Sequence, residues 1–179
     1  MSLPEELVQK YPSLKNFKKL GDDYVEWNDG REVKLLQFIY KHPSLPQMRG
    51  NPAKVCAAID EFAAQQEFLI NIGSDKGRIV ADLIGEEKPK VFVELGGYIG
   101  YSAIFFADKM RQSLPDGANA QYWSLEFDPL FASITMNLVD LAGLSEIVKV
   151  VTGTAAESLK RLTVEGKIDH IDMLFPRSC

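Results

Sequence analysis

The sequence has few of the residues that build metal clusters, disulfide frameworks or basic binding faces. Its 179 residues include only two cysteines and two histidines, and 25 aspartates and glutamates outnumber 20 lysines and arginines. Cys56 lies in a helical pattern and Cys179 is the last residue, so we expect two reduced thiols and no cysteine-based metal site. The net charge of -5 argues against a nucleic-acid partner, because such a partner requires a basic face.

Long apolar runs are also missing, which bears on the location of the protein. No stretch of about 18 apolar residues is present, so a membrane-spanning helix is not expected. The opening residues, Met1 to Glu6, carry acids where a signal peptide has basic and then apolar residues. We therefore expect a cytoplasmic protein with no membrane partner. With 46% hydrophobic and 25% charged residues, the chain has the composition of one folded domain with a sizeable core.

After a helical lead, the chain alternates between segments typical of strands and segments typical of helices. Strands are expected at Val91–Leu95, Gln121–Leu125, Ile147–Val151 and Ile168–Phe175. Helices are expected at Asp29–His42, Pro52–Leu69, Gly73–Ile84, Tyr101–Met110, Asp128–Leu141 and Ala155–Leu162, preceded by two short helices within Glu5–Leu20. The prolines between residues 43 and 52 predict a loop. This alternation predicts an α/β fold with a parallel, doubly wound sheet.

The most informative segment joins the first predicted strand to the helix that follows it. Gly96, Gly97 and Gly100 let the backbone turn tightly and approach a ligand at the start of that helix. A dinucleotide fingerprint would require glycine where Leu95 stands, and a Walker loop would require lysine directly after Gly100. Neither pattern is present.

Acidic residues separate the remaining alternatives for this turn. Glu94 would repel a pyrophosphate, but it would attract the sulfonium and amino groups of S-adenosylmethionine. Glu126 ends the second predicted strand, where α/β cofactor folds keep an acid for ribose hydroxyls. The turn and its two acids therefore indicate an S-adenosylmethionine site. The alternatives are a structural strand-to-helix turn without a ligand and, for Glu126, an ordinary polar strand end.

With these residues in place, the sequence resembles the cation-dependent O-methyltransferases, most closely the catechol O-methyltransferases. The similarity runs from about Asn28 to Phe175 and rests on five motifs, Asn71–Gly77, Glu94–Ala103, Glu126–Pro129, Asp140–Gly143 and Ile171–Phe175. It implies a Rossmann-like S-adenosylmethionine-dependent methyltransferase fold with N-terminal helices and a strand order of third, second, first, fourth. Residues 1–27 would be an N-terminal extension and residues 28–179 a single methyltransferase-like domain.

The resemblance also implies a site and a reaction, namely methyl transfer to a hydroxyl group of a small catechol-type molecule. Phe68 would line the substrate pocket, although an apolar stripe of this kind is also typical of core. The cofactor-binding positions it implies are Ile70, Ile72, Glu94, Gly96, Tyr98, Ser102, Glu126, Phe127 and Ala155. Ala155 stands where the family offers a polar side chain to the adenine, so weaker binding is expected there.

The end of the sequence departs from the family pattern. The family binds Mg²⁺ through an aspartate after the fourth strand, followed by a catalytic lysine, and Arg177 stands at that aspartate position. An arginine has no acceptor and would repel a cation. Asp172 is the alternative ligand, but it lies five positions earlier. We therefore expect a domain incomplete at its C-terminus, cut short after the fourth strand, with no catalytic or metal-binding residue assigned.

Two functions stay open on this basis. The chain is either a catechol-type O-methyltransferase by descent with little or no magnesium-dependent turnover, or a non-catalytic binding or interaction protein that keeps a partial cofactor cleft. Pro176 has no amide hydrogen, so we expect the chain to leave the sheet there. An exposed fourth strand predicts self-association through the edge of the sheet.

Overall fold

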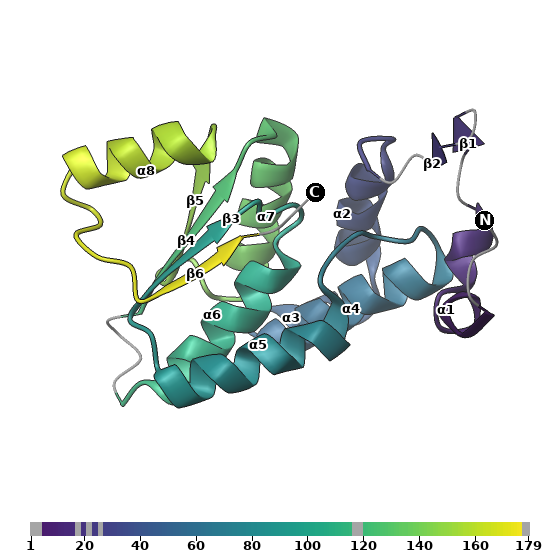
Figure 1. Ribbon diagram of the computed structural model, residues 1–179. Helices are drawn as coiled ribbons and strands as arrows, with labels where there is room; N and C mark the ends of the chain where they lie inside the picture. The colour runs from purple at the N-terminus through teal and green to yellow at the C-terminus, as the bar shows by residue number, and fades with distance from the viewer. Residues whose placement is uncertain (1–4, 17–18, 21–22, 25–26, 116–119, 177–179) are drawn as a thin grey trace.

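The fold is a four-stranded sheet with helices on both faces and further helices beside it (Figure 1). The computed structural model describes residues 5–16, 19–20, 23–24, 27–115 and 120–176. Arg177 and Cys179, which the sequence singled out, lie outside the described residues. The α/β architecture expected from the alternation of strands and helices is confirmed.

All four strands of the main sheet run parallel. They are β3 (Val91–Leu95), β4 (Gln121–Glu126), β5 (Val148–Thr152) and β6 (Met173–Pro176), in the spatial order β5-β4-β3-β6. This is the predicted order of third, second, first and fourth strand. Two short strands, β1 (Lys19–Leu20) and β2 (Asp23–Tyr24), form a separate antiparallel pair.

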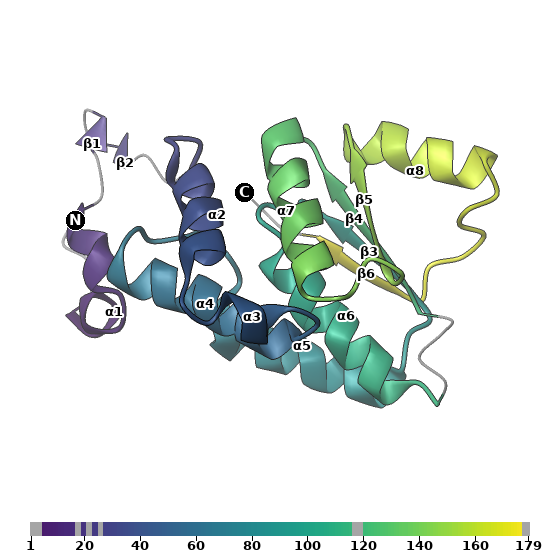
Figure 2. The same ribbon diagram turned by 180° about the vertical axis from the view of Figure 1, so that it is seen from behind.

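The two faces of the sheet are covered by different helices (Figures 1 and 2). Successive side chains of a strand point to opposite faces, so Phe92 and Tyr122 stack at 4.8 Å on the face covered by α6 (Tyr101–Ser113) and α7 (Pro129–Leu141). Val93 packs on the other face with Leu162 of α8 (Ala155–Val164). Strands buried on both faces explain the continuous apolar runs in the sequence.

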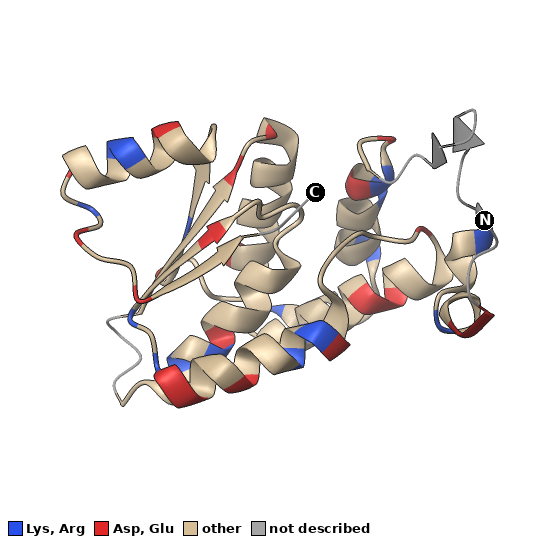
Figure 3. Cartoon of the chain, viewed as in Figure 1, with Lys and Arg blue, Asp and Glu red and all other residues tan. Residues whose placement is uncertain are grey.

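A second layer of helices packs outside α6 and α7. It comprises α2 (Arg31–Lys41), the one-turn α3 (Leu45–Met48), α4 (Pro52–Gln65) and α5 (Gly73–Glu87). Their outer surfaces carry interspersed charges of both signs (Figure 3). Among the described residues, no helix has the length and apolar character needed to cross a membrane.

The N-terminal segment packs against this second layer. It contains α1 (Glu5–Lys10) and a 3₁₀ helix at Pro12–Asn16, in agreement with the two short helices expected before residue 20. The Ser13 hydroxyl donates to the Ala63 carbonyl of α4, and Lys10 forms an ion pair with Asp75 of α5. These contacts attach the segment to the helices next to the sheet.

Several predicted bounds are off by one to three residues, and two further differences concern the region between residues 43 and 69. The helix starting at Pro52 ends at Gln65 instead of Leu69, because the amides of Gln66 and Glu67 both turn back to the Phe62 carbonyl. The predicted loop between residues 43 and 52 contains the single helical turn α3, which accepts a proline because the first turn needs no amide hydrogen there.

The fourth strand begins later than predicted and includes the proline expected to leave the sheet. It starts at Met173, and Pro176 pairs in register with Leu95. Among the described strands β6 lies at the edge of the sheet, where a proline is tolerated because one side of the strand has no hydrogen-bonding neighbour. Asp172 stays outside the strand and binds the start of β3 instead, because its carboxylate accepts from the amides of Lys90 (2.9 Å) and Val91 (2.8 Å).

Replacing Asp172 by alanine is therefore expected to destabilise the fold by about 1–2 kcal/mol at pH 7, because two amides at the start of β3 lose a charged acceptor. The backbone hydrogen bond from Val91 lowers the pKa of Asp172 below its usual value. A lowered pKa stabilises the folded state above the unfolded pKa of about 3.9, and this contribution is lost as the pH falls through the folded pKa. Urea unfolding at pH 7 and pH 3 measures both effects, and a destabilisation that is equal at the two pH values would contradict the assignment.

Candidate functional site

Most of the predicted site residues lie at the carboxyl ends of the parallel strands, on one end of the sheet. Gly96 follows β3, Phe127 follows β4, Ala155 begins the helix after β5, and Phe175 lies near the end of β6. From β3 the chain continues to β4 and β5 on one side, and it then returns to place β6 on the other side of β3. Ligands of open α/β sheets bind outside the carboxyl ends at such a switch point.

The glycine turn between β3 and α6 is built by close backbone packing. Gly96 and Gly100 adopt φ of 88° and 83°, a region that favours glycine. The Gly96 amide donates to the Leu125 carbonyl at 2.8 Å, which ties the turn to β4. At Gly97 an added Cβ would lie 2.3 Å from the Ser124 hydroxyl oxygen. The turn therefore needs glycine for packing as well as for conformation.

Glu94 lies beneath this turn with its side chain fully buried. One carboxylate oxygen accepts from the Ser102 hydroxyl of α6, and the other accepts from the Ser124 hydroxyl of β4 at 2.8 Å. A buried carboxylate is costly unless it is hydrogen-bonded, and these two hydroxyls meet part of that requirement. The acid predicted from the sequence is thus held at the base of the turn by two other elements.

The second acid, Glu126, is bound by the main chain. Its carboxylate accepts from the amide of Tyr98 at 2.7 Å and from the amide of Asp128 at 2.8 Å. The side chain is 7% exposed. Glu126 therefore joins the glycine turn to the start of α7, a structural role that the sequence did not reveal.

Tyr98 anchors the middle of the turn from the inside. Its φ of 51° is unusual for a residue with a side chain, and its ring packs edge-on against Phe131 at 5.1 Å. Its hydroxyl donates to the buried Glu32 carboxylate of α2 at 2.8 Å, and Thr135 donates to its carbonyl. The tyrosine thus fixes the turn against α2 and α7, and its side chain is not among those that line the neighbouring cavity.

A cavity of about 380 Å³ lies between the turn, β6 and the start of α5. This volume is within the range of small-molecule sites. Its walls include three of the predicted residues, Ile70, Ile72 and Ser102. The other lining residues were not predicted as site residues from the sequence; they are Asn71, Lys76, Ile79, Val80, Phe175 and Pro176. Of these, Asn71 was signalled by its position between the two isoleucines.

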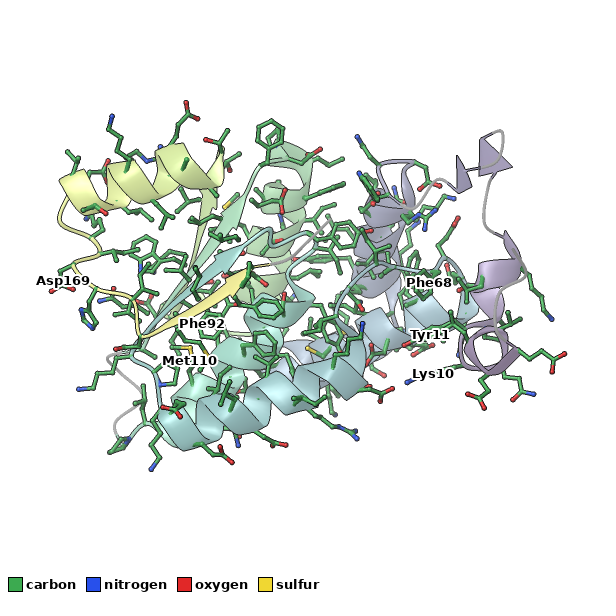
Figure 4. All side chains as sticks on the ribbon, viewed as in Figure 1. Lys10, Tyr11, Phe68, Phe92, Met110 and Asp169 are labelled. Carbon is green, nitrogen blue, oxygen red and sulfur yellow. The ribbon has the colours of Figure 1, made fainter. Side chains whose placement is uncertain are left out.

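Phe68, predicted to line a substrate pocket, is not among the residues around this cavity. Its ring packs edge-on against Tyr11 at 5.1 Å, and both are labelled in Figure 4. Its carbonyl accepts from the Arg31 guanidinium at 2.6 Å. In this structure Phe68 connects the loop before the cavity to the N-terminal segment and α2.

The remaining predicted positions border the open side of the site. Phe127 follows β4 with its side chain 72% exposed, which is unusual for an aromatic residue of a small domain. Ala155 is the first residue of α8 and is partly exposed. Both are accessible to a ligand lying across the ends of β4 and β5.

The resemblance implies two bound groups, S-adenosylmethionine and Mg²⁺, and the side chains of this site fit the first of them. The buried Glu94, the glycine turn and the apolar walls of the cavity fit an amino-acid-bearing nucleoside. The amide nitrogen of Asn71 is also buried without a hydrogen-bond partner among the described residues, so a donor is available there. Magnesium has no such fit, because the described residues contain no group of three or more His, Cys, Asp and Glu side chains that could hold a metal ion. We therefore assign no magnesium ligand.

Comparisons with known proteins identify relatives of this chain. The family profile described as O-methyltransferase matches residues 51–177. Catechol O-methyltransferase of Bos taurus is 31% identical over 94% of this chain and 63% of its own length. The Mus musculus enzyme is 32% identical over 81% of this chain and 51% of its own length. The chain thus spans between about half and two thirds of these relatives.

Solved structures of O-methyltransferases are similar to this chain in fold. An O-methyltransferase from Bacillus cereus in complex with SAH matches with a TM-score of 0.55 and 25% identity, over 77% of this chain and 55% of that chain. An O-methyltransferase from Streptomyces achromogenes in complex with SAM matches with a TM-score of 0.55 and 21% identity, over 85% of this chain and 60% of that chain. The Rossmann-like fold predicted from the resemblance is confirmed. Because the family profile matches well over half of its residues, the chain belongs to the O-methyltransferase family.

Proposed function

We propose that this chain carries the S-adenosylmethionine-binding part of an O-methyltransferase that acts on a hydroxyl group of a catechol-type small molecule. The observation that carries the proposal is the buried Glu94, which two hydroxyl groups hold under a glycine turn beside a cavity of about 380 Å³. The similarity to catechol O-methyltransferases supports the substrate class. A cytoplasmic location and a role in catechol metabolism are part of this proposal.

Different residues of the site contact different parts of the cofactor. Glu94 presents negative charge toward the cofactor's ammonium group, and Ile70 and Ile72 give apolar walls to its methionine chain. Glu126 holds the turn and lies at the strand end where an acid reaches ribose hydroxyls. Phe127 and Ala155 flank the adenine. When bound, the cofactor supplies a methyl group on a positively charged sulfur.

We further propose that the 179 residues alone bind the cofactor without magnesium-dependent methyl transfer. Arg177 stands where the resemblance places a metal-binding aspartate, and its guanidinium repels a cation. The test is transfer of a labelled methyl group from S-adenosylmethionine to catechol, with and without Mg²⁺, together with a cofactor-binding titration. Cofactor binding without turnover supports the proposal, whereas turnover that depends on Mg²⁺ contradicts this assignment of Arg177.

A second candidate function, non-catalytic association, is favoured by the exposed side of β6. Among the described strands β6 lies at an edge of the sheet, with Leu174 50% exposed and Ile171 just before it 40% exposed. Apolar side chains on an edge strand promote pairing of its open side with another strand. We propose that two copies of the chain associate through this edge.

Light scattering at increasing concentration tests this association. Leu174→Lys is expected to shift the population toward the monomer, because a charge at the edge opposes pairing. Val164→Lys is the matched control, since Val164 is 79% exposed at the end of α8. A wild-type chain that stays monomeric at high concentration, or an equal effect of both substitutions, speaks against the edge.

A further inference from the structure

The loop between α4 and α5 contacts both the cavity beside the glycine turn and the N-terminal segment. Three of its residues, Ile70, Asn71 and Ile72, line the cavity. The N-terminal segment reaches the same loop through Tyr11, whose ring packs edge-on against Phe68 at 5.1 Å (Figure 4). One wall of the cavity is therefore also a docking surface for a segment that is remote in sequence.

Tyr11 meets this loop at both of its ends. It is half-buried, and burial raises the pKa of its hydroxyl group. At one end its ring contacts Phe68. At the other end its hydroxyl oxygen lies beside Gly73, the first residue of α5, where an added Cβ would be 3.7 Å from it. A single side chain of the N-terminal segment thus spans the stretch of loop that lines the cavity.

Further contacts hold the N-terminal segment in this position. The Ser13 hydroxyl donates to the Ala63 carbonyl of α4, and the Leu14 side chain is buried. Lys10 forms an ion pair with Asp75 in the first turn of α5. Both side chains of that pair are exposed to solvent, so it contributes little to stability. The buried contacts are what attach the segment to α4 and to the loop.

Docking of the segment and binding of a ligand are coupled through this loop. Ile70 and Ile72 stand between the two points where Tyr11 meets the loop, so loss of the Tyr11 contacts lets that part of the loop move. A ligand that lies against the two isoleucines needs the arrangement that Tyr11 supports. Docking therefore strengthens ligand binding, and ligand binding must strengthen docking by the same factor.

We propose that Tyr11 is a positioning residue for the cofactor, which acts by holding the loop of Ile70 and Ile72 in place as a wall of the cavity. The inference rests on the proposed function, because it places the cofactor's methionine chain against these two isoleucines. It gives a role to the N-terminal extension, residues 1–27, which the family resemblance leaves without one. The segment sets cofactor affinity without touching the cofactor.

Calorimetric titration with two ligands tests the assignment. S-adenosylhomocysteine carries the amino-acid chain that would lie against the loop, whereas 5′-methylthioadenosine lacks it. Tyr11→Ala is expected to weaken S-adenosylhomocysteine binding by about 5- to 10-fold, a modest coupling between two sites, and to leave 5′-methylthioadenosine binding unchanged. Tyr11→Phe keeps the ring that packs against Phe68, so it is expected to bind both ligands as the wild type does.

Tyr40→Ala is the matched control, because Tyr40 is 41% exposed on α2 and does not line the cavity. Thermal melting of each variant verifies folding. Unchanged S-adenosylhomocysteine affinity in Tyr11→Ala, or equal weakening of both ligands, would overturn the inference while leaving the proposed function intact. A folded wild-type chain that binds neither ligand would overturn the proposed function and the inference together.

Hydrogen exchange in the wild-type chain gives a test that needs no variant. The Tyr11 amide donates to the Leu7 carbonyl at 2.9 Å, and the Leu14 amide donates to the Tyr11 carbonyl at 3.0 Å. A helix as short as α1 is not stable on its own, so these hydrogen bonds report on docking. Both amides are expected to exchange about 5- to 10-fold more slowly at saturating S-adenosylhomocysteine, because the coupling is reciprocal. Equal exchange rates with and without the bound ligand would also overturn the inference.

Discussion

Replacing Gly97 by alanine is expected to destabilise the fold by about 1–3 kcal/mol and to abolish cofactor binding. The new Cβ would lie 2.3 Å from the Ser124 hydroxyl oxygen and 3.5 Å from the Glu94 carboxylate. Contact at 2.3 Å is far inside van der Waals distance, so the turn or Ser124 must move, and forced repacking carries a cost of this size. Urea unfolding and calorimetry with S-adenosylhomocysteine measure the two effects.

A second substitution separates the steric explanation from general damage to the turn. In Gly97→Ala/Ser124→Ala the clashing oxygen is gone, and the Ser124 Cβ would be 3.6 Å from the added carbon, an ordinary contact. The double variant is therefore expected to be less destabilised than the sum of the two single variants. Gly85→Ala in α5 is the control, because its Cβ meets the flexible end of Lys109 and otherwise lies 4.0 Å from the Ser113 hydroxyl oxygen. Strict additivity of the two substitutions would contradict the proposed clash.

Replacing Glu94 by glutamine is expected to weaken cofactor binding by roughly 10- to 150-fold while the fold is retained. Glutamine has nearly the same shape, so the Ser102 and Ser124 hydroxyls can still hydrogen-bond to its amide. The substitution removes the negative charge, and a hydrogen bond to a charged group contributes about 1.5–3 kcal/mol. Calorimetric titration of S-adenosylhomocysteine measures the loss, and thermal melting shows that the protein is folded.

The ligand 5′-methylthioadenosine is the internal control for Glu94→Gln. It has no ammonium group, so its affinity is expected to be the same for the variant and the wild type. If the substitution weakens both ligands equally, Glu94 supports the turn as a whole and does not recognise the ammonium group. Asp128, which caps α7 through the Leu130 amide at 2.7 Å, offers a nearby acid whose replacement by asparagine should not change the selectivity.

The sequence predicts β3 well because this strand is buried on both faces. The bounds predicted for Val91–Leu95 agree with the structure, since this is a buried strand that ends at glycines. The predicted start of the fourth strand is five residues too early, because Ile168 is apolar and buried but packs against Leu162 without joining the sheet. Apolar character alone does not distinguish a core residue before a strand from one inside it.

The site could be predicted where its residues follow strand ends, and not where tertiary contacts set their roles. Glu94 and Ser102 lie on one strand-turn-helix unit, so local sequence places them together. The partners of Glu126 and Tyr98 come from elsewhere: the Tyr98 amide lies 28 positions from Glu126, and Glu32 lies 66 positions from Tyr98. No local pattern carries this information. The same reason explains why Lys76 was missed, since only the packing of α5 brings its side chain to the cavity.

The central claim is that S-adenosylmethionine binds over the glycine turn, at the carboxyl ends of the strands. The most direct test is the pattern of amide chemical-shift changes when S-adenosylhomocysteine is added to the isotope-labelled chain. We predict saturable changes at Gly96, Ser102, Phe127 and Ala155. Another cavity, of about 270 Å³ and lined by Cys56 and Arg78 among others, should be unaffected. Changes confined to that cavity, or none at the glycine turn, would contradict the claim.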